Sequence, residues 1–162
     1  MVIQEEQKGI TRKGEKMKVS TRVEYGLIAL ADIMIHCENG QSVSAPDIAK
    51  RQNISHKYLE HILLPLRQAG FITAQKGLRG GYVLSCKPEC VKLSDVLNAL
   101  DNTLLAGTET DEEEGGLRPV INGFFWQKIN GNLKEYTDRM SLSEFVAQAR
   151  SGMSEGWDNY VI

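Results

Sequence analysis

The sequence has few cysteines, few prolines and no long apolar run. Its 162 residues include four prolines and three cysteines, namely Cys37, Cys86 and Cys90. An odd number of cysteines argues against a disulfide framework, so we expect thiols. No segment approaches the roughly 18 consecutive apolar residues of a membrane span, and the polar residues 1–16 lack the apolar core of an export signal. We therefore expect a cytoplasmic protein with no membrane segment.

The chain also lacks the net positive charge of many nucleic-acid-binding proteins, because its formal charge is −2. That charge is unevenly distributed. Residues 17–92 carry ten Lys or Arg against six Asp or Glu, a net of +4, whereas residues 93–162 carry five against twelve, a net of −7. A basic half joined to an acidic half is typical of a phosphate-binding module with a separate assembly region.

Capping residues and apolar periodicity predict a helix-turn-helix in the basic half. A first helix is expected from Thr21 to about Cys37, and Ser44 begins a short second helix that has proline in its first turn. After the turn at residues 52–54, a third helix is expected over Ser55–Gln68. Two short capped helices joined by three or four residues are typical of a DNA-binding helix-turn-helix, whose second helix enters the major groove.

Two short β-prone runs follow the third helix, which is the expected DNA-recognition helix. They cover Phe71–Gln75 and Tyr82–Cys86, and they are separated by the glycine-rich, basic residues 76–81. This pattern predicts a hairpin with a basic tip, which is the form of a wing. The expected fold is mainly α with a small β-hairpin, a winged helix-turn-helix followed by a long C-terminal dimerisation helix.

The acidic half is predicted to be helical around one loop. Ser94 is expected to cap a short helix through Leu100, and a long amphipathic helix is expected to begin at Val120. Ser141 is expected to cap the last helix. The predicted division is a disordered extension over 1–16, a winged domain over 17–92, dimerisation helices over 93–150 with an acidic loop over 102–116, and a tail over 151–162.

The polar side chains of the third helix are the candidate DNA-reading groups. They lie opposite the apolar stripe, where they can reach base edges in the major groove. These candidates are Ser55, His56, Lys57, Tyr58, Glu60 and His61. Arg67, Lys76 and Arg79 are placed to neutralise phosphates, and Arg79 in the wing is able to enter the minor groove.

Several separated motifs of the chain form one ordered pattern. They are Met17–Thr21 followed by Tyr25–Leu27, Ile54–Ser55, Tyr58–Glu60, Leu66–Gly70 and Gly80–Leu84. Together they resemble the Rrf2 family of winged-helix regulators, and the resemblance runs from Met17 to about Ala149. It implies a homodimer in which the long helix, Val120–Arg139, crosses to the other subunit. It also implies that Ser55, Lys57, Tyr58, Glu60 and Lys76 approach DNA.

The same resemblance bears on cofactors. One branch of the family holds an iron-sulfur cluster with three closely spaced cysteines in the loop before the long helix. Here residues 102–124 contain neither Cys nor His, so thiolate ligation at that place is impossible. Cys86 and Cys90 form a second possible metal site, with His36 and Cys37 as further ligands. We expect no resident metal or cofactor, and either buried or redox-reactive thiols.

The chain end resembles the cysteine-metabolism repressors of this family. It closes with Tyr160, Val161 and Ile162, similar to the terminal peptide with which serine acetyltransferases enter the active site of cysteine synthase (O-acetylserine sulfhydrylase). A free carboxylate and an apolar terminal side chain suit capture in a small pocket. The alternative is an ordinary apolar terminus packed on its own dimer.

Two functions are open at this point. The first is a sequence-specific, homodimeric repressor of cysteine or sulfur-metabolism genes, controlled through a complex with cysteine synthase. The second is a redox- or ligand-sensing regulator of the same fold, with its chemistry in Cys37, Cys86 or Cys90. We expect no enzyme, because no Ser/His/Asp or paired-carboxylate arrangement stands out and the three histidines lie on or beside the helix-turn-helix.

Overall fold

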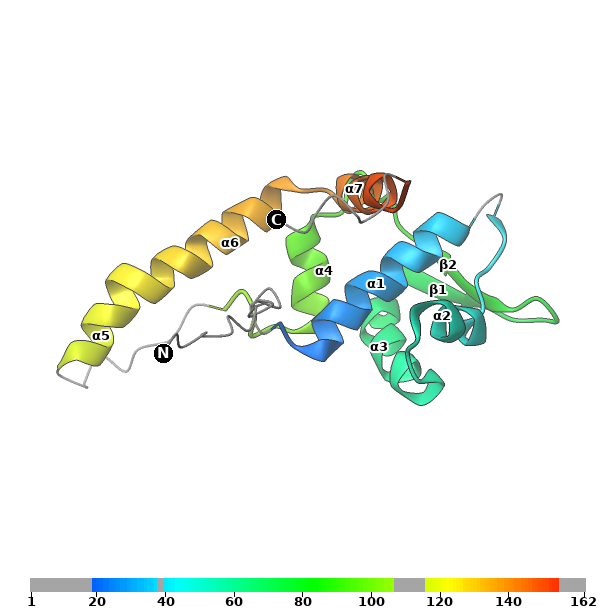
Figure 1. The fold of residues 1–162 in the computed structure, drawn as a ribbon, viewed down its shortest axis with the longest axis horizontal. Helices are drawn as coiled ribbons and strands as arrows, with labels where there is room; N and C mark the ends of the chain where they lie inside the picture. The colour runs from blue at the N-terminus through cyan, green and yellow to red at the C-terminus, as the bar shows by residue number, and fades with distance from the viewer. Residues whose placement is uncertain (1–18, 38–39, 107–115, 155–162) are drawn as a thin grey trace, which may run out of the picture.

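The computed structural model describes residues 19–37, 40–106 and 116–154. In Figure 1 a winged body and a helical arm extend in opposite directions from helix α4 (Leu93–Leu100). The predicted extension over residues 1–16, the acidic part of the predicted loop and the last residues of the chain lie outside the described residues. The predicted fold class, mainly helical with a small hairpin, is confirmed.

Helix α1 (Thr21–His36) is the centre of the body. The hydroxyl of Ser20 caps it by accepting a hydrogen bond from the amide of Val23 at 3.4 Å. Its apolar face packs against the helices that follow, and Gly26 allows the closest approach. A Cβ built at Gly26 would lie 2.4 Å from a methyl carbon of Leu100, so only glycine fits there without a shift.

The helix-turn-helix is formed by α2 (Ala45–Gln52) and α3 (His56–Gln68), as predicted. Ser44 caps α2 by accepting from the amide of Asp47 at 3.2 Å, and Ser55 caps α3. Asn53, in the turn, has a left-handed backbone with φ of 52°, which asparagine tolerates better than most residues. Pro65 lies within α3, and the helix continues past it to Gln68.

The wing is an antiparallel hairpin of β1 (Ile72–Gln75) and β2 (Gly81–Leu84), in which Ile72 pairs with Leu84. Strand β1 begins one residue later than predicted, and β2 begins one residue earlier and ends two residues earlier than predicted. Val43, before α2, forms two backbone hydrogen bonds with Tyr82, of 2.9 and 2.8 Å. This extra bridge fixes the hairpin to the segment that enters the helix-turn-helix.

Helix α4 (Leu93–Leu100) begins two residues earlier than a cap at Ser94 predicts, because Lys92 occupies the cap position, so that prediction is wrong. Ser94 is buried inside the helix, and its hydroxyl donates to a carboxylate oxygen of Asp138 at 2.5 Å. A serine before an apolar run is a cap signal in sequence, but here tertiary packing has turned the hydroxyl towards a later helix.

The arm is a continuous helical segment of α5 (Leu117–Ile121), a π-helical turn η2 (Asn122–Trp126) and α6 (Gln127–Arg139). The arm therefore begins three residues before Val120, where we predicted its start. The prediction of one uninterrupted α-helix is wrong, because a π-helical turn follows the first five residues. The wider turn falls at a glycine-containing stretch, where the α-helix is intrinsically weak.

Helix α7 (Leu142–Ser154) returns to the body. Ser141 caps it as predicted: its hydroxyl accepts from the amide of Glu144 at 3.1 Å, and the Glu144 carboxylate accepts from the amide of Ser141 at 2.8 Å. This reciprocal pair is a capping box. The helix runs four residues into the predicted tail, so residues 151–154 are helical and not part of it.

Candidate nucleic-acid interface

The recognition helix α3 divides sharply into two faces. Leu59, Ile62, Leu63 and Leu66 are each no more than 1% exposed. On the opposite face His56, Lys57, Glu60, His61 and Arg67 are exposed. The apolar face holds the helix to the body, so the polar face is presented outward as one surface, which we call the α3 polar face.

Two of the predicted DNA-reading residues also have structural contacts. Tyr58 is half-buried, and its ring meets the ring of Tyr25 edge to face at 6.0 Å between centroids. The hydroxyl of Ser55 accepts from the amide of Tyr58 at 3.3 Å, which caps α3. Its hydroxyl hydrogen is not used by that bond, so Ser55 can still donate to a phosphate or a base.

Charge on the α3 polar face is mixed. His56 and Glu60 lie one helical turn apart, with 3.9 Å between Nδ1 and the nearer carboxylate oxygen. Both side chains are about half exposed, so this pair contributes little to stability. Glu60 can accept from a cytosine amino group, whereas Lys57 supplies a cation near the start of the helix.

The wing carries Lys76 and Arg79, both exposed, in the loop between β1 and β2. The backbone carbonyl of Arg79 accepts a hydrogen bond of 2.5 Å from the hydroxyl of Ser42. A Cβ on Gly81 would lie 2.5 Å from the carbonyl oxygen of Val43. The strand therefore approaches Val43 more closely than any other residue would allow, and the part of the wing next to its turn is held against the segment that leads into α2.

A buried carboxylate fixes α2 to α1. Asp32 is 2% exposed and accepts two hydrogen bonds from Arg51, of 2.6 and 3.0 Å, and one of 2.6 Å from Gln52. Burial acts to raise the pKa of Asp32, but the hydrogen bonds from Arg51 and Gln52 and the positive charge nearby outweigh it, so the pKa lies below its ordinary value. The positive charge of Arg51 is thus paired with Asp32 of α1 inside the body.

Sequence reasoning missed Arg22 as a candidate. This exposed residue in the first turn of α1 lines a hollow of about 320 Å³ together with Tyr58, His61 and Gln68 of α3. Its side chain therefore adds a cation at the edge of the α3 polar face. No local pattern distinguishes Arg22 from any other surface arginine, and only the packing of α1 on α3 brings it there.

The three cysteines lie at separate places in the fold. Cys37 ends α1 and is half-buried, Cys86 follows β2, and Cys90 is exposed. The thiol of Cys86 donates to the carbonyl of Phe71 at 3.5 Å, and burial raises its pKa. A raised pKa lowers the thiolate fraction of Cys86 and with it the reactivity of this thiol.

The outer part of the arm exposes a continuous apolar stripe, which we call the arm stripe. Phe124 is 65% exposed, although an isolated helix face of this kind is normally covered. Towards the body the same stripe is partly covered, because Leu133 packs against the core. The exposed members of the stripe are Leu117, Val120, Ile121, Phe124, Phe125, Ile129 and Tyr136.

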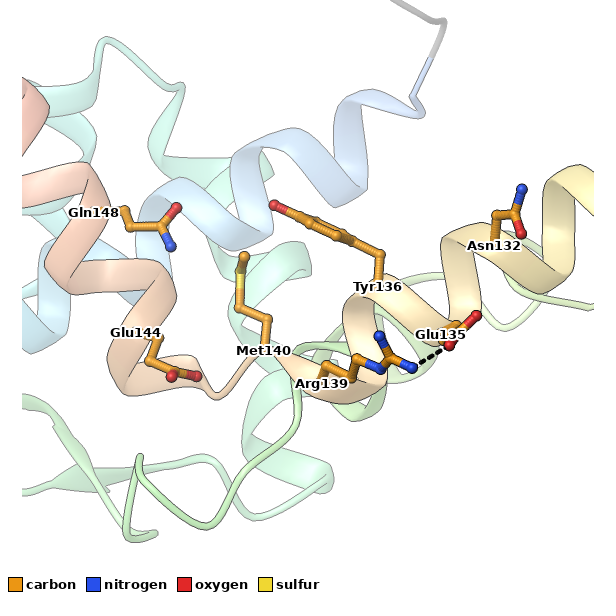
Figure 2. Close-up of a pocket in the computed structure, with 7 residues that line it drawn as sticks. All are labelled: Asn132, Glu135, Tyr136, Arg139, Met140, Glu144 and Gln148. Atoms are coloured by element: carbon orange, nitrogen blue, oxygen red, sulfur yellow. Dashed lines mark hydrogen bonds and ion pairs between the residues drawn. The ribbon is translucent and has the colours of Figure 1, made fainter.

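A hollow of about 450 Å³ lies where α6 turns into α7. Figure 2 shows Tyr136 and Met140 extending over it from the end of the arm, with Gln148 and Glu144 on α7. The Arg139 guanidinium pairs with the Glu135 carboxylate at its rim. The hollow is open and continues the apolar surface of the arm towards the body.

Comparison with known proteins identifies the family. The model of the Rrf2 family, described as iron-dependent transcriptional regulators, matches residues 19–148. The chain belongs to the Rrf2 family. It is thus a DNA-binding transcriptional regulator with a winged helix and not an enzyme, as predicted. Among the residues that the structure describes, no helix is both long and apolar enough to cross a membrane.

Rrf2 relatives differ in how much of their length they share with this chain. It is 47% identical over 97 residues to protein rrf2 of Nitratidesulfovibrio vulgaris, a match covering 60% of this chain and 63% of that protein, which is under two thirds. It is 30% identical over 145 residues to the regulator CymR of Bacillus subtilis, covering 90% of this chain and all of CymR.

Two solved structures resemble the fold over most of its length. The structure of CymR, the global cysteine regulator of B. subtilis, has a TM-score of 0.69 at 28% identity and covers 82% of this chain and 98% of CymR. The structure of IscR from T. potens has a TM-score of 0.67 at 29% identity and covers 89% of this chain and 97% of that one.

The donor set of this Rrf2 chain does not fit an iron-sulfur cluster. Such a cluster needs several thiolate or imidazole ligands close together, yet residues 102–124 contain neither Cys nor His. Across residues 19–37, 40–106 and 116–154, no three His, Cys, Asp or Glu side chains gather where they could hold a metal ion. The absence of a resident cofactor stays a prediction, as do the roles given to the site residues. Tyr160, Val161 and Ile162 lie outside the described residues.

Proposed function

We propose that this regulator binds its operator sequence-specifically, with α3 in the major groove and the hairpin on the adjoining minor groove. The observation that carries this is the α3 polar face, since its side chains are exposed while the opposite face is completely buried. A major groove about 12 Å wide admits a helix presented in this way. Lys57, Arg67, Lys76 and Arg79 supply the positive charge for phosphates.

Selection of bound duplexes from a random pool tests this proposal and yields the operator with its half-site spacing. Lys57→Ala and Arg79→Ala should each weaken binding to the selected duplex and reduce its salt dependence by about one unit of slope. Lys87→Ala is the matched control, because Lys87 is exposed but follows the wing at its base. Recovery of no preferred sequence, with weak binding that ignores both substitutions, would contradict the proposal.

The regulator acts as a homodimer joined through the arm. What supports this is the arm stripe: its large apolar side chains are exposed, on a helical arm that projects away from the body. A second copy can supply a matching stripe, because a two-fold axis presents the same surface on both subunits. Sedimentation over a range of concentrations should reveal a dimer, and a monomer at micromolar concentration would remove this part of the proposal.

We further infer that the target genes serve cysteine metabolism and that cysteine synthase controls the repressor through the chain end. Similarity over the full length of CymR supports the first part, and the terminal Tyr160, Val161 and Ile162 support the second. Deletion of Val161 and Ile162 should abolish capture of purified cysteine synthase and leave binding to the selected duplex intact. Capture that survives the deletion would rule out this partner mode.

A redox-sensing regulator is the second candidate. The exposed Cys90 thiol, four residues from Cys86, favours it. Peroxide should then weaken operator binding, and Cys90→Ser should make binding indifferent to peroxide. If peroxide has no effect on the native chain, redox control through these thiols is excluded.

A further inference from the structure

The tip of the hairpin is a four-residue turn with an unusual pair of residues at its apex. The amide of Gly80 donates to the carbonyl of Gly77 at 2.9 Å, so Leu78 and Arg79 are the two central residues of the turn. Gly77 has a φ of +125°, a conformation that favours glycine. The two glycines thus present Leu78 and Arg79 as the outermost side chains of the wing.

Leu78 is more exposed than any other large apolar side chain that the structure describes, at 109%. Turn apices are dominated by Gly, Pro, Asn, Asp and Ser, because these residues suit the backbone and solvent. Most of the other exposed large apolar residues lie on the arm, as members or neighbours of the arm stripe. Leu78 stands apart from them, on the body and in the middle of the basic wing.

The backbone of the apex is also held in position. The hydroxyl of Ser42 donates to the carbonyl of Arg79. The amide and the carbonyl of Val43 are both hydrogen-bonded to Tyr82, near the turn. These bonds join the turn to the segment that leads directly into α2. The backbone position of Leu78 is therefore held relative to the helix-turn-helix, so the turn itself needs little ordering when it meets a ligand.

We propose that Leu78 is an apolar contact to the DNA minor groove, which seats the wing while Lys76 and Arg79 engage the phosphates beside it. This inference rests on the proposed DNA binding. A minor groove about 6 Å wide admits a single side chain, and proteins that enter this groove commonly place leucine or another apolar residue against the base edges. Lys76 and Arg79, which flank Leu78 in the sequence and are exposed, supply cations for the phosphates that border the groove.

Salt dependence separates the apolar contact from its charged neighbour. Leu78→Ala should weaken binding of the full-length protein to the selected duplex about 5- to 20-fold, the loss of a partly buried leucine side chain. The slope against salt concentration should not change, because an apolar side chain releases no counterions. Arg79→Ala should lower that slope by about one. Leu78→Met should restore most of the affinity, whereas Leu78→Gln, of similar length, should not.

Removing one amino group from the minor groove of the DNA tests whether Leu78 binds in that groove. Guanine carries an amino group in the minor groove that inosine lacks, and their major-groove edges are alike. With G·C pairs placed under the wing, native protein should bind more weakly than with I·C pairs, since the amino group obstructs Leu78. The Leu78→Ala variant should distinguish the two duplexes much less.

The outcomes separate the inference from the function beneath it. If Leu78→Ala binds as tightly as native protein while Arg79→Ala binds more weakly, the wing engages DNA without Leu78, and the inference is overturned alone. If no duplex is selected and neither substitution changes the affinity for DNA, the proposed DNA-binding function is itself wrong. Met153→Ala is the control for loss of an exposed apolar side chain, since Met153 is 64% exposed on α7.

Discussion

The body and the arm use apolar residues in opposite ways. In the body, α1, α3 and α4 bury their apolar faces against one another, and Leu30, Leu59 and Val96 have no exposed surface. In α5, η2 and α6, only Thr137 is buried, and large apolar side chains are exposed. Because the hydrophobic effect favours burial of both sets, the body is stabilised by its own core, whereas the exposed side chains of the arm are covered only in the proposed dimer.

Loss of a core side chain should produce the largest effect. Leu59→Ala removes a completely buried side chain from the apolar face of α3, so we expect a loss of about 2–5 kcal/mol in the free energy of unfolding. Urea denaturation followed by circular dichroism measures it. The exposed Leu64 on the same helix is the matched control, and an equal loss for Leu64→Ala would contradict the division of α3 into two faces.

A charge on the arm should affect assembly and not the fold of one subunit. Phe124→Glu places a carboxylate on the arm stripe of both copies, so the dimer should dissociate about 30- to 1000-fold more readily, a change of roughly 2–4 kcal/mol. Sedimentation measures the dissociation constant. Lys134→Glu, an exposed position on α6, is the control. If Phe124→Glu leaves the dissociation constant unchanged and instead destabilises the fold of the subunit, the contrast between body and arm is wrong.

The Asp32 carboxylate tests whether the body is also held by charge. Asp32→Ala removes the partner of a hydrogen-bonded guanidinium that stays partly exposed, and should cost about 2–3 kcal/mol at neutral pH. The pKa of Asp32 is lower in the folded chain, so its contribution is complete above its unfolded pKa and is lost as the pH falls through its folded pKa.

Urea denaturation of native protein and Asp32→Ala at pH 7 and at about pH 3 measures this dependence. The difference between the two proteins should shrink in acid, because the Asp32 carboxylate takes up a proton in the unfolded chain at a higher pH than in the folded chain. Gln52→Ala, which keeps the ion pair, should have a smaller effect at both pH values. A difference that stays constant would mean that packing, not charge, holds α2 to α1.

The cap at the joint between arm and body should have the smallest effect. Ser141→Ala removes the hydroxyl that accepts from the amide of Glu144, so the free energy of unfolding should fall by about 0.5–1 kcal/mol. Ser141→Asp should retain most of it, because aspartate also caps helices well. Thermal melts of the three proteins measure the series, and an unchanged Ser141→Ala melt would mean that α7 does not depend on its cap.

Local signals predicted the body better than the acidic half. The caps at Ser20, Ser44 and Ser55 and the apolar stripe of α3 act within a few residues, so the sequence was sufficient to place these helices. Ser94 misled because its partner, Asp138, is 44 residues away. The π-helical turn in the arm has no comparable signal, and a glycine there predicts only weakness.

The candidate site divides in the same way. Residues of the α3 polar face could be named from helical periodicity, because the exposed side of an amphipathic helix follows from its buried side. Arg22 could not be named, since a different helix brings it beside His61. The exposed position of Leu78 also needed the hairpin register and the turn between Gly77 and Gly80.

The sequence by itself determined that this chain is a winged-helix regulator and which face of α3 is polar, because helix periods, caps and turn residues act over short distances. Only the tertiary structure decided that Asp32 fixes α2 through Arg51, that Ser42 secures the apex of the wing, and that the arm stripe projects beyond the body. These features depend on contacts between distant segments, whose geometry exists only after the core around α1 has formed.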